Sequence, residues 1–187
     1  MKLAVFLAIG ESWEEFLANG QHDLLRQNFL SYAKNFDEVF IFSYGWLDGI
    51  LGKNIRLFAN KTGLHRFLYS LLQSIFYLKE LKQVSLVRGL QLTGGIPAII
   101  CKMFLHKKVV INYGYDYVRV AEIEGKFWQK LLFQICEVLI LPRVDAVIIT
   151  NPKLTPRVKG SKHVELIPNG VDTDVFKPLS QDKNIDI

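Results

Sequence analysis

Short runs of apolar residues recur along the chain, and each run is continuous rather than alternating between apolar and polar positions. Continuous runs rich in Val, Ile and Phe are typical of strands that are buried on both faces, as in parallel sheets. Only a glycine-containing connection separates the second run from the third, so these two strands are expected to be neighbours without a crossover helix. The runs are Leu3–Ile9, Val39–Tyr44, Ile55–Ala59, Val84–Val87, Val109–Asn112 and Ala146–Thr150.

Longer segments of helical period lie between these runs. Apolar residues repeat at helical spacing over residues 25–36 and over Leu64–Ile75. Pro97 is suited to the first turn of a third helix that runs towards Leu105. A fourth helix is expected at about Glu124–Leu141, with one narrow polar stripe. This alternation predicts an α/β fold, a Rossmann-like doubly wound domain whose mostly parallel sheet has helices on both faces.

Composition and charge limit the size of the domain and the class of partner. The chain has 187 residues, half of them hydrophobic and 22% charged, which is enough to bury the core of one domain with a short excess. The net charge is +5 and the pI is about 9.1, so partners with phosphate or anionic head groups are favoured. The basic residues show no aromatic signature of RNA binding, and no nucleic-acid partner is expected.

Cys101 and Cys136 both lie in apolar, helix-like stretches, which predicts buried, reduced thiols and a cytoplasmic location. The first apolar run ends at Gly10-Glu11 without a small-residue cleavage site, so a buried first strand is preferred over a signal peptide. No apolar run reaches the roughly 18–20 residues that span a bilayer.

Ligands in an open parallel sheet bind beyond the carboxyl ends of the strands. That rule selects the loops at residues 10–20, 88–95, 112–117 and Asn151-Pro152. Arg88 follows a buried strand, where a guanidinium is well placed to bind phosphate or carboxylate. A structural ion pair of Arg88 with Glu11, Glu14 or Asp116 is the alternative.

Two further loops carry candidate chemistry. Gly94-Gly95, before a helix start, either presents backbone N–H groups to an anion or forms a turn that lets the helix pack closely on the sheet. Residues 112–117 combine aromatic rings, an amide and a carboxylate, a composition that suits a sugar. Asp116 is the candidate to accept a hydrogen bond or a proton from an acceptor hydroxyl. Alternatively, it caps a helix or turn, and the tyrosines of this segment belong partly to the core.

Several motifs are missing from the sequence. No G-x-G-x-x-G follows the first strand, which argues against a dinucleotide site and an oxidoreductase. The sequence has no phosphate-binding G-x-x-x-x-G-K-[ST] loop and no serine nucleophile elbow, and its four histidines have no metal spacing. No metal and no cofactor are therefore expected.

The most specific stretch runs from Ile167 to Pro178 and reads I-P-N-G-V-D-T-D-V-F-K-P. It resembles the junction sequence of family 4 glycosyltransferases of the GT-B fold, which read I-P-N-G-V-D, three residues, F, one residue and P where the chain leaves the first domain. The resemblance implies a Rossmann-like N-terminal acceptor-binding domain at residues 1–166. Residues 167–187 would then be the interdomain junction. The junction residues are Pro168, Asn169, Gly170, Asp172 and Phe176.

The order of the preceding segments is also similar to that family. The loop Gly10-Glu11-Ser12-Trp13 departs from it, because relatives have a glycine-rich loop there that contacts donor phosphate. The second domain of the family, with its basic residues and its E-x7-E signature, has no counterpart in the 187 residues. This is expected of a shortened chain or of a separately encoded half that needs a partner.

The resemblance implies a retaining transfer of sugar from a nucleotide-sugar donor, bound by the missing domain, to an acceptor hydroxyl of a glycan or lipid-linked acceptor. Asp116 is the candidate catalytic base, unless the donor phosphate takes the proton. The chain alone is expected to be inactive. A standalone Rossmann-like ligand-binding or scaffold module is the alternative. The expected acceptor-binding residues are Arg88, Gly89, Gly114, Tyr115, Asp116, Glu11 and Asn151.

Basic charge and the apolar helices at residues 64–78 and 126–141 suggest peripheral contact with an anionic membrane surface, on its inner face. The alternative is that one side of each helix packs on the sheet and the rest contacts neighbouring elements.

Overall fold

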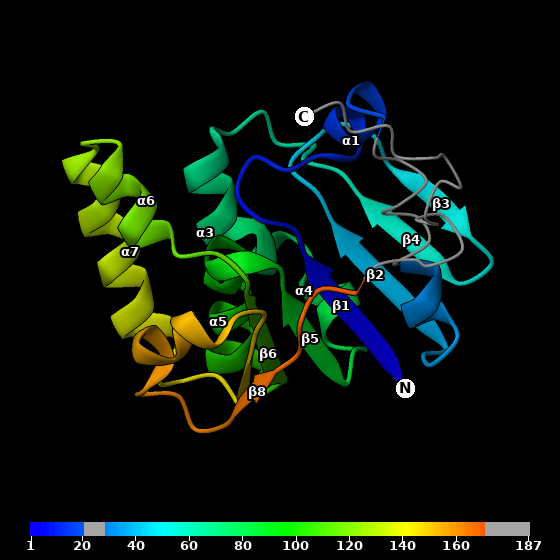
Figure 1. The fold of residues 1–187 in the computed structure, drawn as a ribbon. Helices are drawn as coiled ribbons and strands as arrows, with labels where there is room; N and C mark the ends of the chain where they lie inside the picture. Colours follow the sequence, from blue (N-terminus) through cyan, green and yellow to red (C-terminus); the bar gives the residue numbers. More distant parts are fainter. Residues whose placement is uncertain (21–28, 171–187) are drawn as a thin grey trace, which may run out of the picture.

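A single sheet runs through the part of the chain that the computed structural model describes, residues 1–20 and 29–170, in the order β3-β4-β2-β1-β5-β6-β7-β8 (Figure 1). All neighbouring strands are parallel except β3 and β4. The strands are β1 Lys2–Phe6, β2 Glu38–Phe42, β3 Gly49–Gly52, β4 Ile55–Phe58, β5 Leu86–Gly89, β6 Lys108–Tyr113, β7 Ala146–Ile149 and β8 Val164–Leu166. The helices are α1 Trp13–Ala18, α3 Arg66–Phe76, α4 Leu78–Leu81, α5 Gln91–Leu105, α6 Tyr117–Ile123, α7 Phe127–Ile140 and the 3-10 helix η1 Pro152–Val158.

The Rossmann-like α/β fold is as predicted, and every predicted strand is present. β5 lies two residues further along than its predicted start at Val84. The second and third predicted strands, β2 and β4, pair in parallel without a crossover helix, as expected. Their connection contains β3, which was not predicted. Neither β3 nor β8 has a buried residue, so neither carries the apolar run that marked the other strands.

Alternation along the strands divides the core between the two faces of the sheet. Leu3 and Val5 of β1 point to the face that Trp13 of α1 and Phe29 cover. Phe6 points to the opposite face, where the larger cluster of buried side chains lies. On that face α5 packs against β1, β5 and β6, with α3 on one side and α7 on the other (Figure 1). Both faces of the central strands are therefore buried, as continuous apolar runs require.

The predicted start of the third helix was wrong. α5 begins at Gln91, and Pro97 lies inside it rather than in its first turn. Gly94 and Gly95 lie in this helix where α5 passes close to the sheet and to α7, so a side chain would clash with backbone at Gly94 and be tightly packed at Gly95. A Cβ at Gly94 would lie 2.8 Å from the carbonyl oxygen of Phe6, and one at Gly95 would lie 3.0 Å from Ile140. The N–H of Gly94 bonds to the carbonyl of Leu90. The two glycines allow close packing of the helix, as expected, but they lie within the helix rather than in a turn before it, and the Gly94 N–H is not free for an anion.

The helix predicted at Glu124–Leu141 is α7. α6, which precedes it, was not predicted, because its seven residues directly follow the loop and are too few to show a repeat. Cys101 in α5 and Cys136 in α7 are free and buried, as expected, and burial raises the pKa of each thiol to about 11.

Candidate functional site

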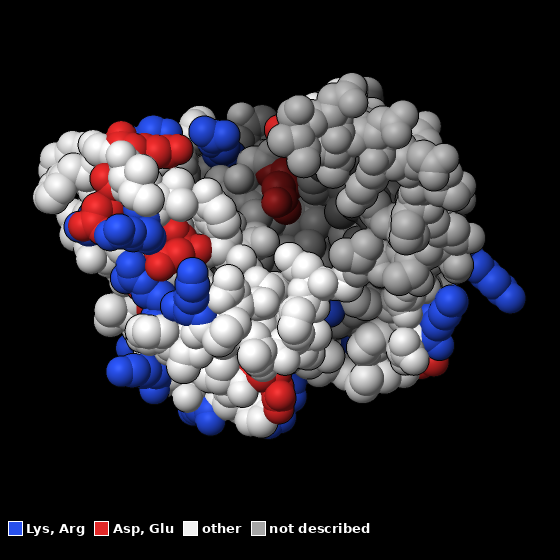
Figure 2. All heavy atoms as spheres, viewed as in Figure 1, with Lys and Arg blue, Asp and Glu red and all other residues white. Residues whose placement is uncertain are grey.

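The strand order reverses between β1 and β5. After β1 the chain turns towards β2, and after β5 it turns towards β6 on the other side. Ligands of doubly wound sheets bind in the crevice at such a switch point, beyond the carboxyl ends of the strands. The two loops are joined there by hydrogen bonds: the Leu90 N–H donates to the Phe6 carbonyl at 2.8 Å, and the Ile9 N–H donates to Thr93 Oγ1 at 3.0 Å. Figure 2 shows a hollow on this side of the molecule with an acidic side chain at its bottom.

Glu11 follows β1 at this switch point. Its Oε2 accepts the N–H of Ala8 at 3.0 Å, and its carbonyl accepts the N–H of Tyr44 at 3.2 Å. Burial raises the pKa of the Glu11 carboxyl by more than the Ala8 hydrogen bond lowers it. The charge of Glu11 in turn contributes to the raised pKa values of Tyr44 and Tyr117, although burial is the main cause in both. No cation forms an ion pair with Glu11 in residues 1–20 and 29–170.

A group of buried polar side chains begins beside this carboxylate at Tyr44 and continues into α3. The hydroxyls of Tyr44 and Ser70 lie close to one another, and within the described residues neither is bonded to any other group. The side chain of Gln73 likewise lies close to the hydroxyl of Tyr69 and has no other partner there. Burial raises the pKa of Tyr44 to about 12; the neighbouring Ser70 hydroxyl opposes this shift and Glu11 adds to it. Buried polar atoms are nearly always bonded, and unbonded ones often mark a site that a water or ligand completes. The sequence analysis missed Ser70 and Gln73; polar residues on the inward side of an otherwise apolar repeat were the available signal.

Arg66 is a second residue that the sequence analysis missed. It begins α3, and its guanidinium Nη1 would lie 3.2 Å from a Cβ at Gly10. Gly10 has a φ of +89°, a conformation that favours glycine. A side chain at this position would strain the loop and crowd Arg66. A cation therefore borders the crevice next to Glu11.

Gly114 lies across the crevice, after β6, and both of its backbone groups are bonded. Its N–H donates to Gln91 Oε1 at 3.3 Å, and its carbonyl accepts the Thr150 hydroxyl at 3.1 Å. Gln91 itself has a φ of +57°, which is uncommon for a residue with a side chain and costs backbone energy. The side chain of Gln91 thus links the end of β5 to the end of β6 at the switch point.

Asp116 caps α6, so its capping alternative is confirmed. Its Oδ1 accepts the N–H of Arg119 at 2.9 Å, and its Oδ2 lies 3.3 Å from Nε of Arg157. Arg157 also approaches Glu137 at 3.9 Å, and the hydroxyl of Tyr113 donates to Glu137. Burial raises the pKa of Glu137, although Tyr113 and Arg157 both oppose that shift. The two oxygens of Asp116 are therefore already engaged. Tyr113 is buried in the core, as the alternative interpretation of this segment predicted.

Arg88 lies within β5 rather than after it. Its Nε donates to Asn112 Oδ1 at 2.9 Å, and its guanidinium lies 4.9 Å from the ring centroid of Tyr32. None of the three expected carboxylates forms an ion pair with it in the described residues. Gly89 is a packing position: a Cβ there would lie 2.6 Å from Ile111 and 2.7 Å from the Gly94 carbonyl oxygen.

The remaining predicted residues lie at the surface. Tyr115 is 48% exposed, and its ring packs edge-on against Tyr117. Asn151 is exposed, and its side chain accepts the N–H of Lys153 as the cap of η1. After β8 the chain runs exposed through Pro168, Asn169 and Gly170. Asp172 and Phe176 lie outside the described residues.

Two further observations concern metal binding and membrane crossing, and both apply to the described residues. They contain no group of three or more His, Cys, Asp or Glu side chains that could hold a metal ion. Their helices are all too short or too polar to cross a membrane.

Comparisons with known proteins show the fold and no family. No protein-family model and no curated protein match the sequence. Two solved structures of a sucrose-phosphate synthase from Thermosynechococcus elongatus are similar. One matches 94% of this chain and 92% of its own at 14% identity and a TM-score of 0.61. The other matches 96% of this chain at 15% identity and a TM-score of 0.69, and the chain spans about half (50%) of its length. The chain therefore has a glycosyltransferase-like, Rossmann-like α/β fold.

Proposed function

We propose that this chain is the N-terminal, acceptor-binding domain of a family 4 glycosyltransferase of the GT-B fold. The observation that carries the proposal is the half-buried Glu11 carboxylate between Tyr44 and Tyr117 at the switch point of the sheet. The junction string from Ile167 to Pro178 and the similarity to a sucrose-phosphate synthase support it.

The chemistry of the crevice suits a sugar or another hydroxylated acceptor. Glu11 accepts a hydrogen bond from an acceptor hydroxyl, since its Oε2 takes only one backbone N–H. The exposed ring of Tyr115 offers an apolar face to the C–H side of a pyranose. Asp116 is the weaker candidate base, because Arg119 and Arg157 occupy its oxygens.

In the proposed reaction the acceptor oxygen bonds to the anomeric carbon of a nucleotide-sugar with retention, and the bond from that carbon to the donor phosphate breaks. The proton of the acceptor hydroxyl passes to the leaving phosphate. Basic groups of a second domain stabilise the charge of that phosphate. Closure of the two domains excludes water from the crevice. Pro168, Asn169 and Gly170 are exposed beyond β8, which leaves room for such a domain to follow or to dock.

The test is sugar transfer by this chain alone and by the chain completed with a domain that carries E-x7-E, either continuous with it or from a separate polypeptide. Nucleoside diphosphate release is followed with a panel of UDP-, GDP- and ADP-sugars. We expect no turnover from the chain alone and turnover from the completed protein. Turnover by the chain alone contradicts the proposal that a second domain must bind the donor. A completed protein that binds sugars without transferring them would indicate the standalone binding or scaffold module.

A further inference from the structure

The helix layer formed by α3, α5 and α7 has an apolar outer side. α5 packs between the other two helices, so their outward sides adjoin. The few charged residues within these helices are mostly engaged with other groups: Lys102 with Asp145, and Lys130 with Glu122. Apolar side chains occupy the outer positions at helical spacing instead. Large exposed examples are Leu71, Ile75, Phe104, Trp128, Ile135 and Val138.

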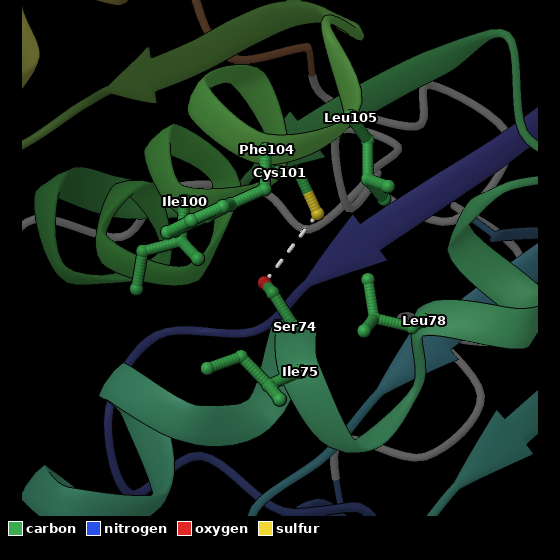
Figure 3. A pocket seen from close by; sticks show the side chains of 7 residues that line it. All are labelled: Ser74, Ile75, Leu78, Ile100, Cys101, Phe104 and Leu105. Carbon is green, nitrogen blue, oxygen red and sulfur yellow. Dashed lines mark hydrogen bonds between the residues drawn. The ribbon is translucent and has the colours of Figure 1, made fainter.

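A pocket of about 210 Å³ opens in this layer between the ends of α3 and α5 (Figure 3). Ser74 and Cys101 point towards one another within it, with Oγ and Sγ 3.4 Å apart. The Ser74 hydroxyl is already bonded to the carbonyl of Pro97 at 2.6 Å. The other side chains that line the pocket are hydrocarbon, including Ile75 and Phe104. The pocket therefore accommodates an apolar chain and offers no free polar group to a hydrophilic ligand.

Three lysines and one carboxylate, Glu80, lie at the end of the layer where this pocket opens. Lys79 follows Leu78 of the pocket wall, and Lys107 lies two residues beyond Leu105. Nζ of Lys107 donates to the carbonyl of Lys82 at 2.8 Å, which brings these two lysines together. None of the three lysines forms an ion pair in the described part of the chain. Charges around α6 and the start of α7, by contrast, are of mixed sign (Figure 2) and paired, for example Arg119 with Glu122.

We propose that the helix layer docks on an anionic lipid bilayer, with an acyl chain in the pocket and lipid head groups against Lys79, Lys82 and Lys107. Amphipathic helices with apolar residues on one side and lysines at the rim bind bilayers in this way. A second copy of the chain is a poorer occupant. A symmetric pair uses the same patch on both copies and would bring two unpaired lysine clusters to one interface.

The proposal deepens the proposed function, on which its choice of acceptor rests. The exposed stripe of α3 begins beside Arg66, next to Gly10 at the crevice, and continues to the pocket. A bilayer along this stripe would lie beside the acceptor site. A lipid-linked acceptor would therefore reach Glu11 without leaving the membrane.

The experiment uses the 187-residue chain with vesicles of phosphatidylcholine alone or mixed with phosphatidylglycerol. We expect co-sedimentation with the anionic vesicles only. Each lysine at an anionic surface strengthens binding about fivefold. The triple variant Lys79→Gln, Lys82→Gln, Lys107→Gln is therefore expected to bind about 100-fold more weakly. The matched control Lys153→Gln, Lys159→Gln, Lys162→Gln removes the same charge around η1 and is expected to bind within about twofold of the unaltered chain.

Tryptophan fluorescence locates the contact. Trp128 of α7 is 78% exposed and Trp46, before β3, is 75% exposed, so they form a matched pair. A blue shift on adding anionic vesicles is expected to be lost in Trp128→Phe and kept in Trp46→Phe. Equal binding of both lysine variants, equal binding to both kinds of vesicle, or a blue shift carried by Trp46 overturns the proposal. So does a stable dimer that binds no vesicles and that Phe104→Ser dissociates.

Vesicle binding by this chain needs no donor domain and no sugar. A completed enzyme that transfers sugar but binds no vesicles contradicts the docking alone. A chain that binds vesicles through Trp128, but whose completed form transfers no sugar, contradicts the proposed function alone.

Discussion

Two parts of the same sheet edge carry similar residues that differ in how completely their polar groups are hydrogen-bonded. The β1–β2 part, formed by Glu11, Tyr44 and Ser70, contains a carboxylate with a single hydrogen bond and two buried hydroxyls that are bonded to no group beyond this pair in the described residues. The β6–β7 part is formed by Tyr113, Asp116, Glu137 and Arg157. There, each carboxylate meets Arg157 and a further donor.

The difference shows that position at the end of a strand does not by itself make a polar residue available to a ligand. Asp116 is a carboxylate at the end of a strand, as a ligand-binding residue would be, yet its hydrogen bonds stabilise α6 and η1. Glu11, in a loop that departs from the glycosyltransferase pattern, retains the capacity to bind. The structure shows the β6–β7 part in a supporting role, and the proposed acceptor site is accordingly the β1–β2 part.

The largest expected effect is on catalysis. In the completed enzyme Glu11→Gln should lower kcat/KM for the acceptor about 10- to 100-fold, because a hydrogen bond to a charged group contributes about 1.5–3 kcal/mol. Asp116→Asn is the matched variant in the β6–β7 part, and its main effect should be on stability. Steady-state kinetics at varied acceptor concentration measure both. A larger loss of activity in Asp116→Asn would reverse the assignment of the two parts.

Removing the cation of the β6–β7 part should cost stability. Arg157→Ala leaves Asp116 and Glu137 without their shared cation, and we expect the free energy of unfolding to fall by about 2 kcal/mol. This is less than the roughly 3–5 kcal/mol of a fully buried pair, because Arg157 is partly exposed. Lys153→Ala on the same 3-10 helix should change it by less than about 0.5 kcal/mol. Urea unfolding of the two variants gives both values, and equal values would mean that the network stabilises nothing.

A matched pair of tyrosines compares the parts directly. Tyr113→Phe removes the donor to Glu137 and should destabilise the chain by about 1 kcal/mol. Tyr44→Phe removes a buried hydroxyl whose neighbour is the hydroxyl of Ser70 and which has no other partner in the described residues, so it should change stability by less than about 0.5 kcal/mol. Thermal unfolding at one pH suffices. A Tyr44→Phe variant less stable than Tyr113→Phe would show that the β1–β2 part is also saturated.

The smallest effect is a pH dependence. Burial raises the pKa of Glu11 in the folded chain above that in the unfolded chain. The contribution of Glu11 to stability is therefore fully present below the unfolded pKa and is lost as the pH rises through the folded pKa. Glu11→Gln carries no charge and avoids that loss. The variant should gain stability relative to the unaltered chain as the pH rises above the ordinary glutamate value of 4.5, measured by urea unfolding. A gain that instead shrinks would mean that the folded pKa is lowered.

The sequence predicted much of the fold and less of the site. Continuous apolar runs marked the six inner strands, because burial on both faces leaves few polar positions, such as Arg56 in β4 and Arg88 in β5. β3 and β8 were not predicted, because they are edge strands without buried residues. Gly89, Gly94 and Gly95 looked like loop or ligand positions. They are instead the places where α5 and the sheet touch, a contact between segments that no local pattern reveals.

By itself, the sequence determined the alternation of strands and helices, the buried thiols and the resemblance carried by the string after residue 166, because each depends on local pattern or composition. Only the tertiary structure decided which polar groups are satisfied. It paired Asp116 with Arg157, placed Arg88 inside β5 against Asn112, and left the carboxylate of Glu11 without an ion pair in the part of the chain that it describes. The reason is that hydrogen bonding and desolvation depend on neighbours brought together by folding, often from more than twenty residues away in sequence.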